Sequence, residues 1–341
     1  MIDIKKRMEH YHITGLSIVT IDKGHIFRTE HYGLMEAGAN RPITDQSLFN
    51  ACSISKFFTS ILVLKLVEQG ILDLDEDVNS RLTSWQIPDN EYTSLKKVTL
   101  RSLLCHQSGI VDPEESFLPA KDSQKIPAIF ELLNGKTSFY STPIKVTSKP
   151  ESEFHYSDTG FCIIQLLIED TTGKPFYELM DELIFKPLHM TNSLFANNLT
   201  LVNMGNLACG HHHNGTPISG KYSIYPYPAA CGLWTSASDL AILVQEVLNT
   251  VKGQSKIGLS TTYIKELLKP QGCVKWTGLG VFLDGQEEML EFSSLGWGVG
   301  FQCMLVAYPY LEKGLIIMTN TDTGIHQMKG IIGEIYQSFM N

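Results

Sequence analysis

The alternation of apolar and polar residues near the N-terminus predicts a β-hairpin. The segments GLSIVTID (15–22) and HIFRTEHYGL (25–34) are joined by Lys23-Gly24, which suits a tight turn. Residues 1–10 are expected to form a helix before them. The last quarter of the chain predicts further strands and a final helix, in WTGLGVFLDG (276–285), FQCMLVAYP (301–309), KGLIIMTNTD (313–322) and from about Ile325 to Phe339.

Between Leu48 and about Phe195 the apolar residues recur mostly at helical spacing. SKFFTSILVLKLVEQG predicts a helix that stops at Gly70, and TGFCIIQLLIEDTTG predicts one that stops at Gly173. A later segment, DLAILVQEVLNTVKG, predicts another amphipathic helix. Strands near both termini with helices between them predict an α/β (α+β) fold, in which one sheet is assembled from the two ends and a helical region is inserted into it.

Length and charge restrict the class of protein. A chain of 341 residues fits one large domain or two closely packed ones, and 43% apolar with 18% charged residues is ordinary for a globular protein. The net charge is −9, and no run of Lys or Arg extends beyond IKKR at 4–7. These values argue against a nucleic-acid or anionic-membrane surface. We therefore expect a small-molecule or short-peptide substrate as the partner.

The cysteines and the N-terminus bear on the compartment. Seven cysteines make an odd count, and most lie in apolar segments such as GFCIIQLL, so we expect buried free thiols in a reducing compartment. The first residues carry charges where a signal peptide needs an apolar stretch, and no run of 18 apolar residues predicts a membrane span. The expectation is a cytoplasmic protein.

A serine and a lysine three positions apart stand near the start of the first long helix, in NACSISKFF (50–58). Residues at i and i+3 share one helix face, so Ser53 and Lys56 can touch if a helix begins near Ser53. A serine hydroxyl needs a neighbouring base to become a nucleophile. Taken alone, Ser53 is equally explained as a helix cap, and Lys56 as a surface lysine.

Further motifs follow in a recognisable order: SISK is followed by VTLRSLLCHQSGI (98–110), FHYSDTGF (154–161), IFKPLHMTNSLF (184–195) and AACGLWTSASDLA (229–241). Over nearly its whole length the chain resembles the serine β-lactamase/penicillin-binding-protein superfamily. More narrowly, it is similar to the class C β-lactamase-like branch, which includes esterases, D-amino-acid peptidases and acyltransferases. The resemblance implies an antiparallel sheet flanked by terminal helices, with the active site in a cleft between residues 1–47 with 205–341 and the mostly helical residues 48–204.

The resemblance also implies roles for individual residues. Ser53 is the nucleophile, and the oxygen of Tyr156 lies near Ser53 and Lys56 and shuttles the proton to the leaving group. Whether Lys56 or Tyr156 is the first base stays open. Without the resemblance, Tyr156 reads as a core tyrosine with a hydrogen-bonded tip.

Two departures from the family pattern affect the substrate. The K-T-G or H-x-G triplet of the relatives is replaced by Ser294-Leu295-Gly296, which removes a cation but leaves the amides of Ser53 and Trp297 as oxyanion donors. Asp158 stands where relatives usually have Asn, so it favours the ammonium form of Lys56 and repels anionic substrates. Both changes argue against efficient hydrolysis of penicillins.

The histidines and Trp234 have simpler interpretations. Consecutive histidines at 211–213, flanked by Gly and Asn, rarely converge on one ion, so we expect no metal and no cofactor. His106 is expected to fix its loop by hydrogen bonds, and Trp234 to pack in the core.

The sequence therefore predicts a serine hydrolase that acts through a Ser53 acyl-enzyme on an ester, amide or small-peptide substrate and is a poor β-lactamase. One alternative is an acyltransferase that uses the same acyl-enzyme. The other is a non-catalytic ligand sensor that kept the fold and lost turnover.

Overall fold

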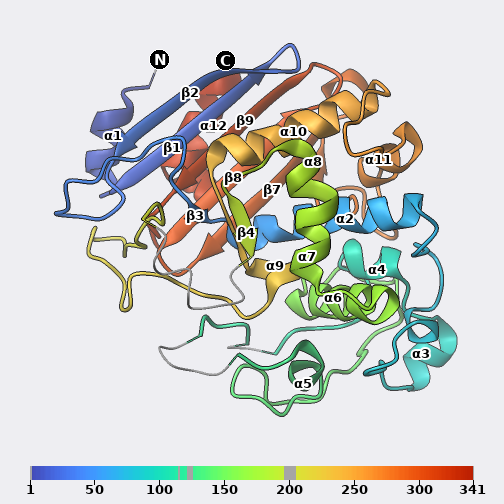
Figure 1. Cartoon of the computed structure of the whole chain (residues 1–341). Coiled ribbons are helices and arrows are strands. Elements are labelled where there is room, and N and C mark those ends of the chain that lie inside the picture. The colour runs from blue at the N-terminus through green and yellow to red at the C-terminus, as the bar shows by residue number, and fades with distance from the viewer. Residues whose placement is uncertain (1, 114–115, 121–125, 196–204, 341) are drawn as a thin grey trace.

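A six-stranded antiparallel sheet is the central element of the computed structural model, which describes residues 2–113, 116–120, 126–195 and 205–340 (Figure 1). Its strand order is β2-β1-β9-β8-β7-β6. Strand β1 pairs with β9, so the N-terminal hairpin and the C-terminal strands form one sheet, as predicted. The strands are β1 Gly15–Asp22, β2 His25–Gly33, β6 Phe282–Asp284, β7 Glu291–Gly298, β8 Phe301–Tyr308 and β9 Lys313–Thr319.

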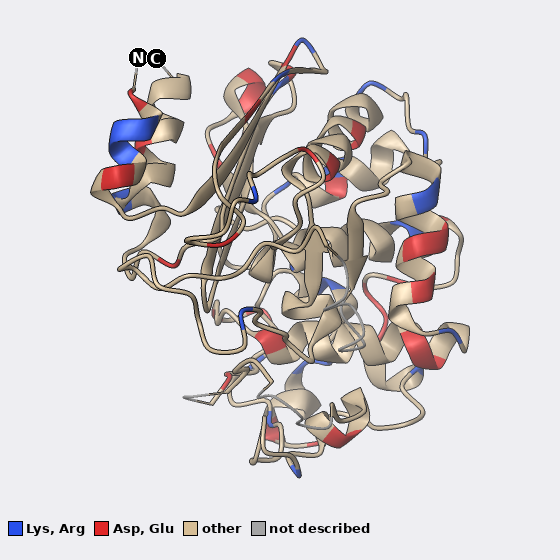
Figure 2. Cartoon of the chain, turned by 60° about the vertical axis from the view of Figure 1, so that its left-hand side comes forward, with Lys and Arg blue, Asp and Glu red and all other residues tan. Residues whose placement is uncertain are grey.

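Helices cover both faces of this sheet. Helices α1 (Ile4–His10) and α12 (Ile331–Met340) lie on one face, where side chains such as Leu315 and Ile317 of β9 point. Figure 2 shows the two terminal helices side by side, and the Arg7 guanidinium of α1 donates to the Glu334 carboxylate of α12. The alternate residues of β9 face the large core cluster that includes α10 (Ala237–Val251). The central strands are apolar because both of their faces are buried.

The second layer is built around α2 (Ser55–Glu68), which is buried along nearly its whole length. This explains why its sequence is apolar on every side. A small sheet of order β3-β5-β4, formed by Phe49–Asn50, Leu233–Thr235 and Ser193–Phe195, lies beside it. The other helices are α3 Glu91–Leu95, α4 Leu100–Leu104, α5 Ile129–Leu133, α6 Asp158–Thr172, α7 Phe176–Met180, α8 Lys186–Leu188, α9 Pro228–Cys231 and α11 Thr261–Leu267.

Two predicted elements differ from the structure. Of WTGLGVFLDG only Phe282–Asp284 is a strand, because the preceding loop passes very close to its neighbours: a Cβ on Gly278 would lie 2.1 Å from the Leu267 carbonyl oxygen. The last helix begins at Ile331 rather than Ile325. A short 3₁₀ turn, Gln327–Lys329, precedes it and is separated from it by the extended residue Gly330.

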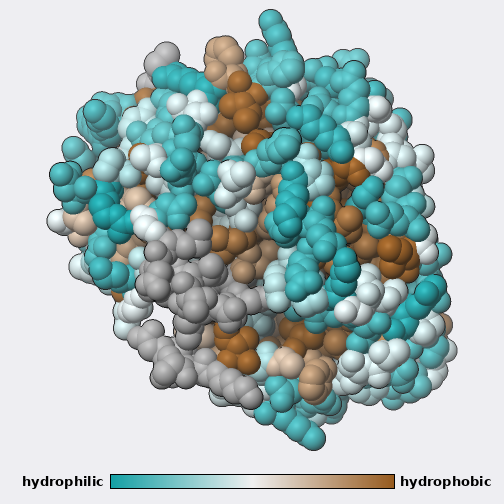
Figure 3. Space-filling model, in the orientation of Figure 1, coloured by the Kyte–Doolittle hydropathy of each residue, from teal (hydrophilic) through white to brown (hydrophobic). Residues whose placement is uncertain are grey.

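The free cysteines and the mixed charges on the surface are typical of a globular protein. All seven cysteines lie in described residues and are free; Cys273 is exposed and the other six are buried. In Figure 2 acidic and basic residues are interspersed, and Figure 3 shows a mainly hydrophilic face with scattered apolar residues. Within the described ranges, every helix is too short or too polar to cross a bilayer.

Candidate active site

Ser53 lies on a tight turn immediately before α2. Residues Cys52–Ile54 form a 3₁₀ turn, and Cys52 has a φ of +48°, a conformation that is strained for a residue with a side chain. The Cys52 amide donates to Asn50 Oδ1 over 2.8 Å, and the Ser55 hydroxyl donates to the Cys52 carbonyl over 2.6 Å, which hold the turn. Helix α2 begins after Ile54 without a side-chain cap, so the interpretation of Ser53 as a helix cap is wrong.

Lys56 extends from the first turn of α2 towards Ser53. Its Nζ donates to Ser53 Oγ over 3.2 Å and to the Ala230 carbonyl over 3.0 Å, and it lies 2.5 Å from Asp158 Oδ1. The side chain is 2% exposed. Burial is the largest single effect and disfavours the ammonium, but the Asp158 carboxylate, together with Tyr156 and Cys231, outweighs burial and raises the pKa of Lys56 well above its ordinary value. Lys56 is therefore a buried cation, as the sequence predicted for a lysine beside Asp158.

Tyr156 precedes α6 and is the third candidate catalytic residue, after Ser53 and Lys56. Its ring centroid is 4.9 Å from Lys56 Nζ. Although 41% of the residue is exposed, burial of its phenolic oxygen raises the pKa to about 12, against the lowering effect of Lys56 and of side-chain hydrogen bonds with Lys56 and Ser53. The hydroxyl thus faces the serine and the lysine while part of the ring stays open to solvent. A fully buried core tyrosine is excluded.

The ring of His106 packs against the ring of Tyr156. Its ring stacks on the Tyr156 ring with centroids 4.4 Å apart, and its Nδ1 accepts a hydrogen bond from the Ser157 amide over 3.1 Å. Burial and the nearby Lys56 ammonium lower the pKa of His106 to about 3, so the imidazole is neutral at physiological pH. As predicted, His106 fixes its loop by hydrogen bonds.

Asp112 was not identified from the sequence. Its carboxylate accepts hydrogen bonds from the Ser157 hydroxyl at 2.8 Å and from the Asp158 and Thr159 amides at 2.5 and 3.3 Å, at the N-terminus of α6. An anion at this position satisfies free amides and the helix dipole. Asp112 therefore holds the segment that carries Tyr156 and Asp158. No local pattern signals this role, because the partners are more than forty residues away.

Cys231 was also missed. Its thiol donates to Asp158 Oδ1 over 3.6 Å, next to the Ala230 carbonyl that accepts from Lys56. Burial raises the pKa of Cys231 to about 12, so it remains a thiol. It packs beneath the ion pair instead of serving as a second nucleophile.

Strand β7 forms the opposite wall. Ser294 is buried and lines one hollow with Ser53, Lys56 and Tyr156. Gly296 has no room for a side chain, because a Cβ would lie 2.3 Å from both the Ala51 carbonyl oxygen and Cys303 Sγ. The strand therefore lies directly against the turn that carries Ser53.

The backbone of Trp297 points away from β8. Gly298 and Phe301 pair across the two-residue turn that joins β7 to β8, and alternate residues of an antiparallel pair face their partner strand. The N–H of Trp297 consequently points away from β8, towards the other edge of β7. On that edge β6 pairs with Glu291–Ser293 and does not extend to Trp297. The Trp297 indole is 43% exposed and donates to Asp322 Oδ1 over 2.8 Å.

The other candidates are structural. His211 is buried, its Nε2 accepts from the Ala37 amide at 3.1 Å, and its Nδ1 bonds the Asn320 carbonyl at 2.8 Å, which leaves neither nitrogen free for a metal. In the described part of the chain, no group of three or more metal-ligating side chains converges. Trp234 is buried and packs edge-on against Phe301, as predicted.

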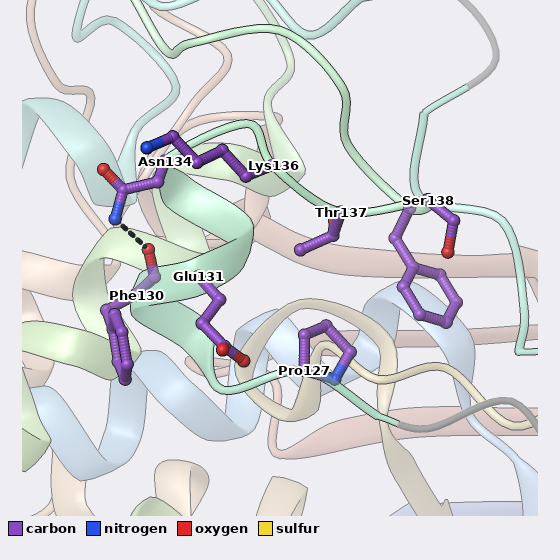
Figure 4. Close-up of a pocket in the computed structure, with 8 residues that line it drawn as sticks. Pro127, Phe130, Glu131, Asn134, Lys136, Thr137 and Ser138 are labelled. Carbon is purple, nitrogen blue, oxygen red and sulfur yellow. Dashed lines mark hydrogen bonds between the residues drawn. The ribbon is translucent and has the colours of Figure 1, made fainter.

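A separate hollow beside α5 lies between Phe130, Asn134 and the segment 136–139 (Figure 4). Asn134 Nδ2 donates to the Phe130 carbonyl there over 2.9 Å. None of Ser53, Lys56 and Tyr156 lines this hollow, so it is distinct from the one at Ser53.

The family follows from a match along almost the entire sequence. The family model described as Beta-lactamase matches residues 3–333. The chain belongs to the beta-lactamase family. Among curated relatives, Protein flp of Staphylococcus aureus (strain MRSA252) is 24% identical over 332 residues, covering 94% of this chain and 62% of that protein. Penicillin-binding protein 4* of Bacillus subtilis (strain 168) is 29% identical over 181 residues, covering 52% of this chain and 37% of that protein. The chain thus spans about three fifths of the length of the first of these relatives.

Solved structures agree on the beta-lactamase fold. The octameric penicillin-binding protein homologue from Pyrococcus abyssi has a TM-score of 0.76 at 21% identity, covering 94% of this chain and 72% of that one. A penicillin-binding protein from Bacillus halodurans has a TM-score of 0.75 at 19% identity, covering 99% of both chains. The structure of SurE with D-Leu has a TM-score of 0.73 at 23% identity, covering 94% and 70%. The predicted superfamily and its mixed α/β fold with an antiparallel sheet are confirmed.

Proposed function

We propose that the protein is a serine hydrolase that forms an acyl-enzyme on Ser53 with ester, amide or small-peptide substrates and hydrolyses β-lactams poorly. One observation carries the proposal: Lys56 Nζ lies 3.2 Å from Ser53 Oγ and 4.9 Å from the centroid of the Tyr156 ring, and the three residues line one hollow. This is the arrangement of a nucleophile with its base and a cation. Membership of the beta-lactamase family supports a hydrolase of the serine type.

In the first step, Ser53 Oγ attacks the substrate carbonyl carbon while its proton moves to the oxygen of Tyr156, which must be in its phenolate form to accept it. Tyr156 takes the role of base because Asp158 keeps Lys56 protonated. The Lys56 ammonium stabilises the negative charge on the tyrosine oxygen. The developing oxyanion receives hydrogen bonds from the amides of Ser53 and Trp297.

In the second step, the bond from the carbonyl carbon to the leaving group breaks, and Tyr156 returns the proton to the leaving oxygen or nitrogen. Water then attacks the acyl-enzyme, with Tyr156 again accepting its proton and passing it to Ser53. The proposed division into residues 1–47 with 205–341 and residues 48–204 puts Ser53 and Tyr156 on one side of the cleft and the Ser294–Trp297 segment on the other.

The charges of the site define the substrate. The side chains that line the hollow include one cation, Lys56, and it is paired with Asp158. Ser294 supplies a hydroxyl where a cation could bind a carboxylate. A substrate carboxylate therefore finds no free positive charge in this lining, which disfavours penicillins and peptides that end in a free carboxyl group near the scissile bond.

A small alkyl phosphonofluoridate tests the proposal, because it labels activated serines without needing a particular substrate. We expect mass spectrometry to find one adduct, on Ser53, and Ser53→Ala to lose both labelling and hydrolysis of activated esters while its melting temperature is kept. Absence of labelling in the native protein would favour the ligand sensor. If Ser53 is labelled but esters are not hydrolysed in water, and turnover appears when an alcohol or amine is added, the acyltransferase is favoured.

A further inference from the structure

A continuous row of aromatic rings leads outward from Tyr156. His106 contacts both Tyr156 and Phe154, with centroid distances of 4.4 and 5.8 Å. Phe154 packs edge-on against Trp276 at 4.4 Å, and Trp276 lies 6.1 Å from Phe282 of β6. The rings come from three separate parts of the chain, and we call Phe154, Trp276 and Phe282 the aromatic wall.

The aromatic wall is not closed core. Trp276 is 45% exposed, and Phe154 and Phe282 are partly exposed. Phe282 lines the same hollow as Ser53, Tyr156 and Ser294. Core aromatics of this size are normally buried, so an exposed face that begins at the nucleophile is available to a ligand.

The position of the wall identifies which half of the substrate it meets. Tyr156 protonates the leaving group in the proposed mechanism, so the leaving group must lie against Tyr156. Phe282 of the wall lines the hollow together with Tyr156, and Trp276 and Phe154 continue outward from it. The acyl carbon, in contrast, lies between Ser53 and β7.

The hollow at Ser53 also offers no unpaired cation to a ligand. Beside the rings of His106, Tyr156 and Phe282, the lining of the hollow contains Val281 and Leu295, and its one cation, Lys56, is paired with Asp158; Phe154 and Trp276 continue the row of rings beyond this lining. The exposed Lys275 precedes Trp276 but is absent from this lining. An apolar, flat leaving group buries its surface here without leaving a charge unpaired, whereas a carboxylate is desolvated beside apolar rings.

We propose that the aromatic wall is the leaving-group subsite, and that it selects esters or amides whose leaving alcohol or amine carries an aromatic, uncharged group. This inference rests on the proposed acylation of Ser53 and adds the substrate class. Trp276 is its principal specificity residue because it has the largest exposed ring of the three.

The test uses three acetate esters, of phenylpropanol, hexanol and hydroxyhexanoate, whose substituents lie far from the reacting oxygen. Their leaving alcohols have similar basicity, and all three form the same acetyl-enzyme, so differences in kcat/KM report acylation alone. We expect the phenylpropyl ester to exceed the hexyl ester by about fivefold, the size of an aromatic contact, and the carboxylate ester to be slowest.

Variants of Trp276 distinguish a role in binding the leaving group from a general loss of activity. Trp276→Ala should remove the phenylpropyl preference by lowering kcat/KM for the phenylpropyl ester more than for the hexyl ester, whereas Trp276→Phe should retain most of the preference. Tyr310→Ala is the matched control, because Tyr310 is an aromatic residue with the same 45% exposure, whereas it is Trp276 that contacts Phe154 and Phe282. It should change none of the three values.

Each outcome decides one of the two proposals. If the phosphonofluoridate labels Ser53 but Trp276→Ala lowers all three esters equally, the subsite is wrong and the hydrolase stands. If the carboxylate ester is fastest and Lys275→Gln removes that advantage, Lys275 binds the leaving group and the inference is overturned. Failure of labelling in the native protein removes the proposed function itself.

Discussion

Lys56 and Asp158 form an ion pair beside the nucleophile, with Nζ 2.5 Å from Oδ1. The same Nζ reaches Ser53 Oγ at 3.2 Å, so the lysine that is expected to activate the serine is held as a cation by a carboxylate. An ammonium cannot accept a proton, so the proposed general base is Tyr156 in its phenolate form. The predictions below follow from this arrangement and from the fit of β7 against Ser53.

The pH dependence reports which residue is the base. Because burial raises the pKa of Tyr156 to about 12, the phenolate fraction grows with pH throughout the accessible range. We expect kcat/KM on a neutral ester to rise from pH 7 to pH 10 by about tenfold per pH unit, as for any base below its pKa. Tyr156→Phe should abolish the rise, measured against the Ser53→Ala background. A flat profile in the native protein would contradict phenolate catalysis.

Asp158→Asn should displace that profile towards lower pH. Asp158 raises the pKa of Tyr156 and of Lys56, so its removal lowers both, and a proton acceptor becomes available nearer neutrality. A displacement of about one pH unit is expected for the loss of one adjacent charge. The melting temperature of the variant serves as the control for folding. An unchanged profile would show that Asp158 does not govern the base.

Charge preference should follow Ser294 and Asp158. The native protein should prefer a neutral acyl group over a matched carboxylate-bearing one, since the lining offers no unpaired cation. The double variant Ser294→His with Asp158→Asn adds a donor and removes an anion. It should move the kcat/KM ratio towards the anionic ester by about tenfold, the value of one charge-assisted hydrogen bond. Brisk penicillin hydrolysis by the native protein would mean that another residue binds the carboxylate.

Gly296→Ala should damage activity through geometry. The new Cβ would lie 2.3 Å from both the Ala51 carbonyl oxygen and Cys303 Sγ, so β7 and the Ser53 turn must move apart. We expect a loss of kcat on the order of 100-fold, as for small displacements of reacting groups, with a lower melting temperature. Gly205→Ala is the control, because its Cβ meets no atom within 4 Å. Full activity of Gly296→Ala would show that the strand can relax.

Chelation should leave the enzyme active. Both ring nitrogens of His211 are engaged with the backbone at 3.1 and 2.8 Å, and proton transfer is assigned to side chains at Ser53. Dialysis against a chelator should therefore keep at least most of the esterase rate. Loss of activity that returns with a divalent metal would require a metal site that involves His212 or His213.

Local sequence patterns were enough to predict the order and type of the principal elements. Local periodicity located α2, α6 and α10, Lys23-Gly24 marked the β1–β2 turn, and the motif order gave the superfamily and the candidates Ser53, Lys56 and Tyr156. These features are encoded within a few neighbouring residues, where apolar spacing and turn chemistry act directly. The loop at 276–281 misled the strand prediction because its glycines serve close packing against other segments.

The assembly of the candidate site depends on contacts that form when the chain folds. The hydrogen bonds of Asp112 to the start of α6, the contact of Cys231 with Asp158, and the row of rings from Tyr156 to Phe282 join residues 45 to 126 positions apart. Such contacts depend on how the sheet and the helices pack, and no local pattern encodes them. The protonation of Lys56 illustrates the same limit: the sequence showed that Asp158 would favour the ammonium, but the balance against burial depends on the 2.5 Å separation that folding creates.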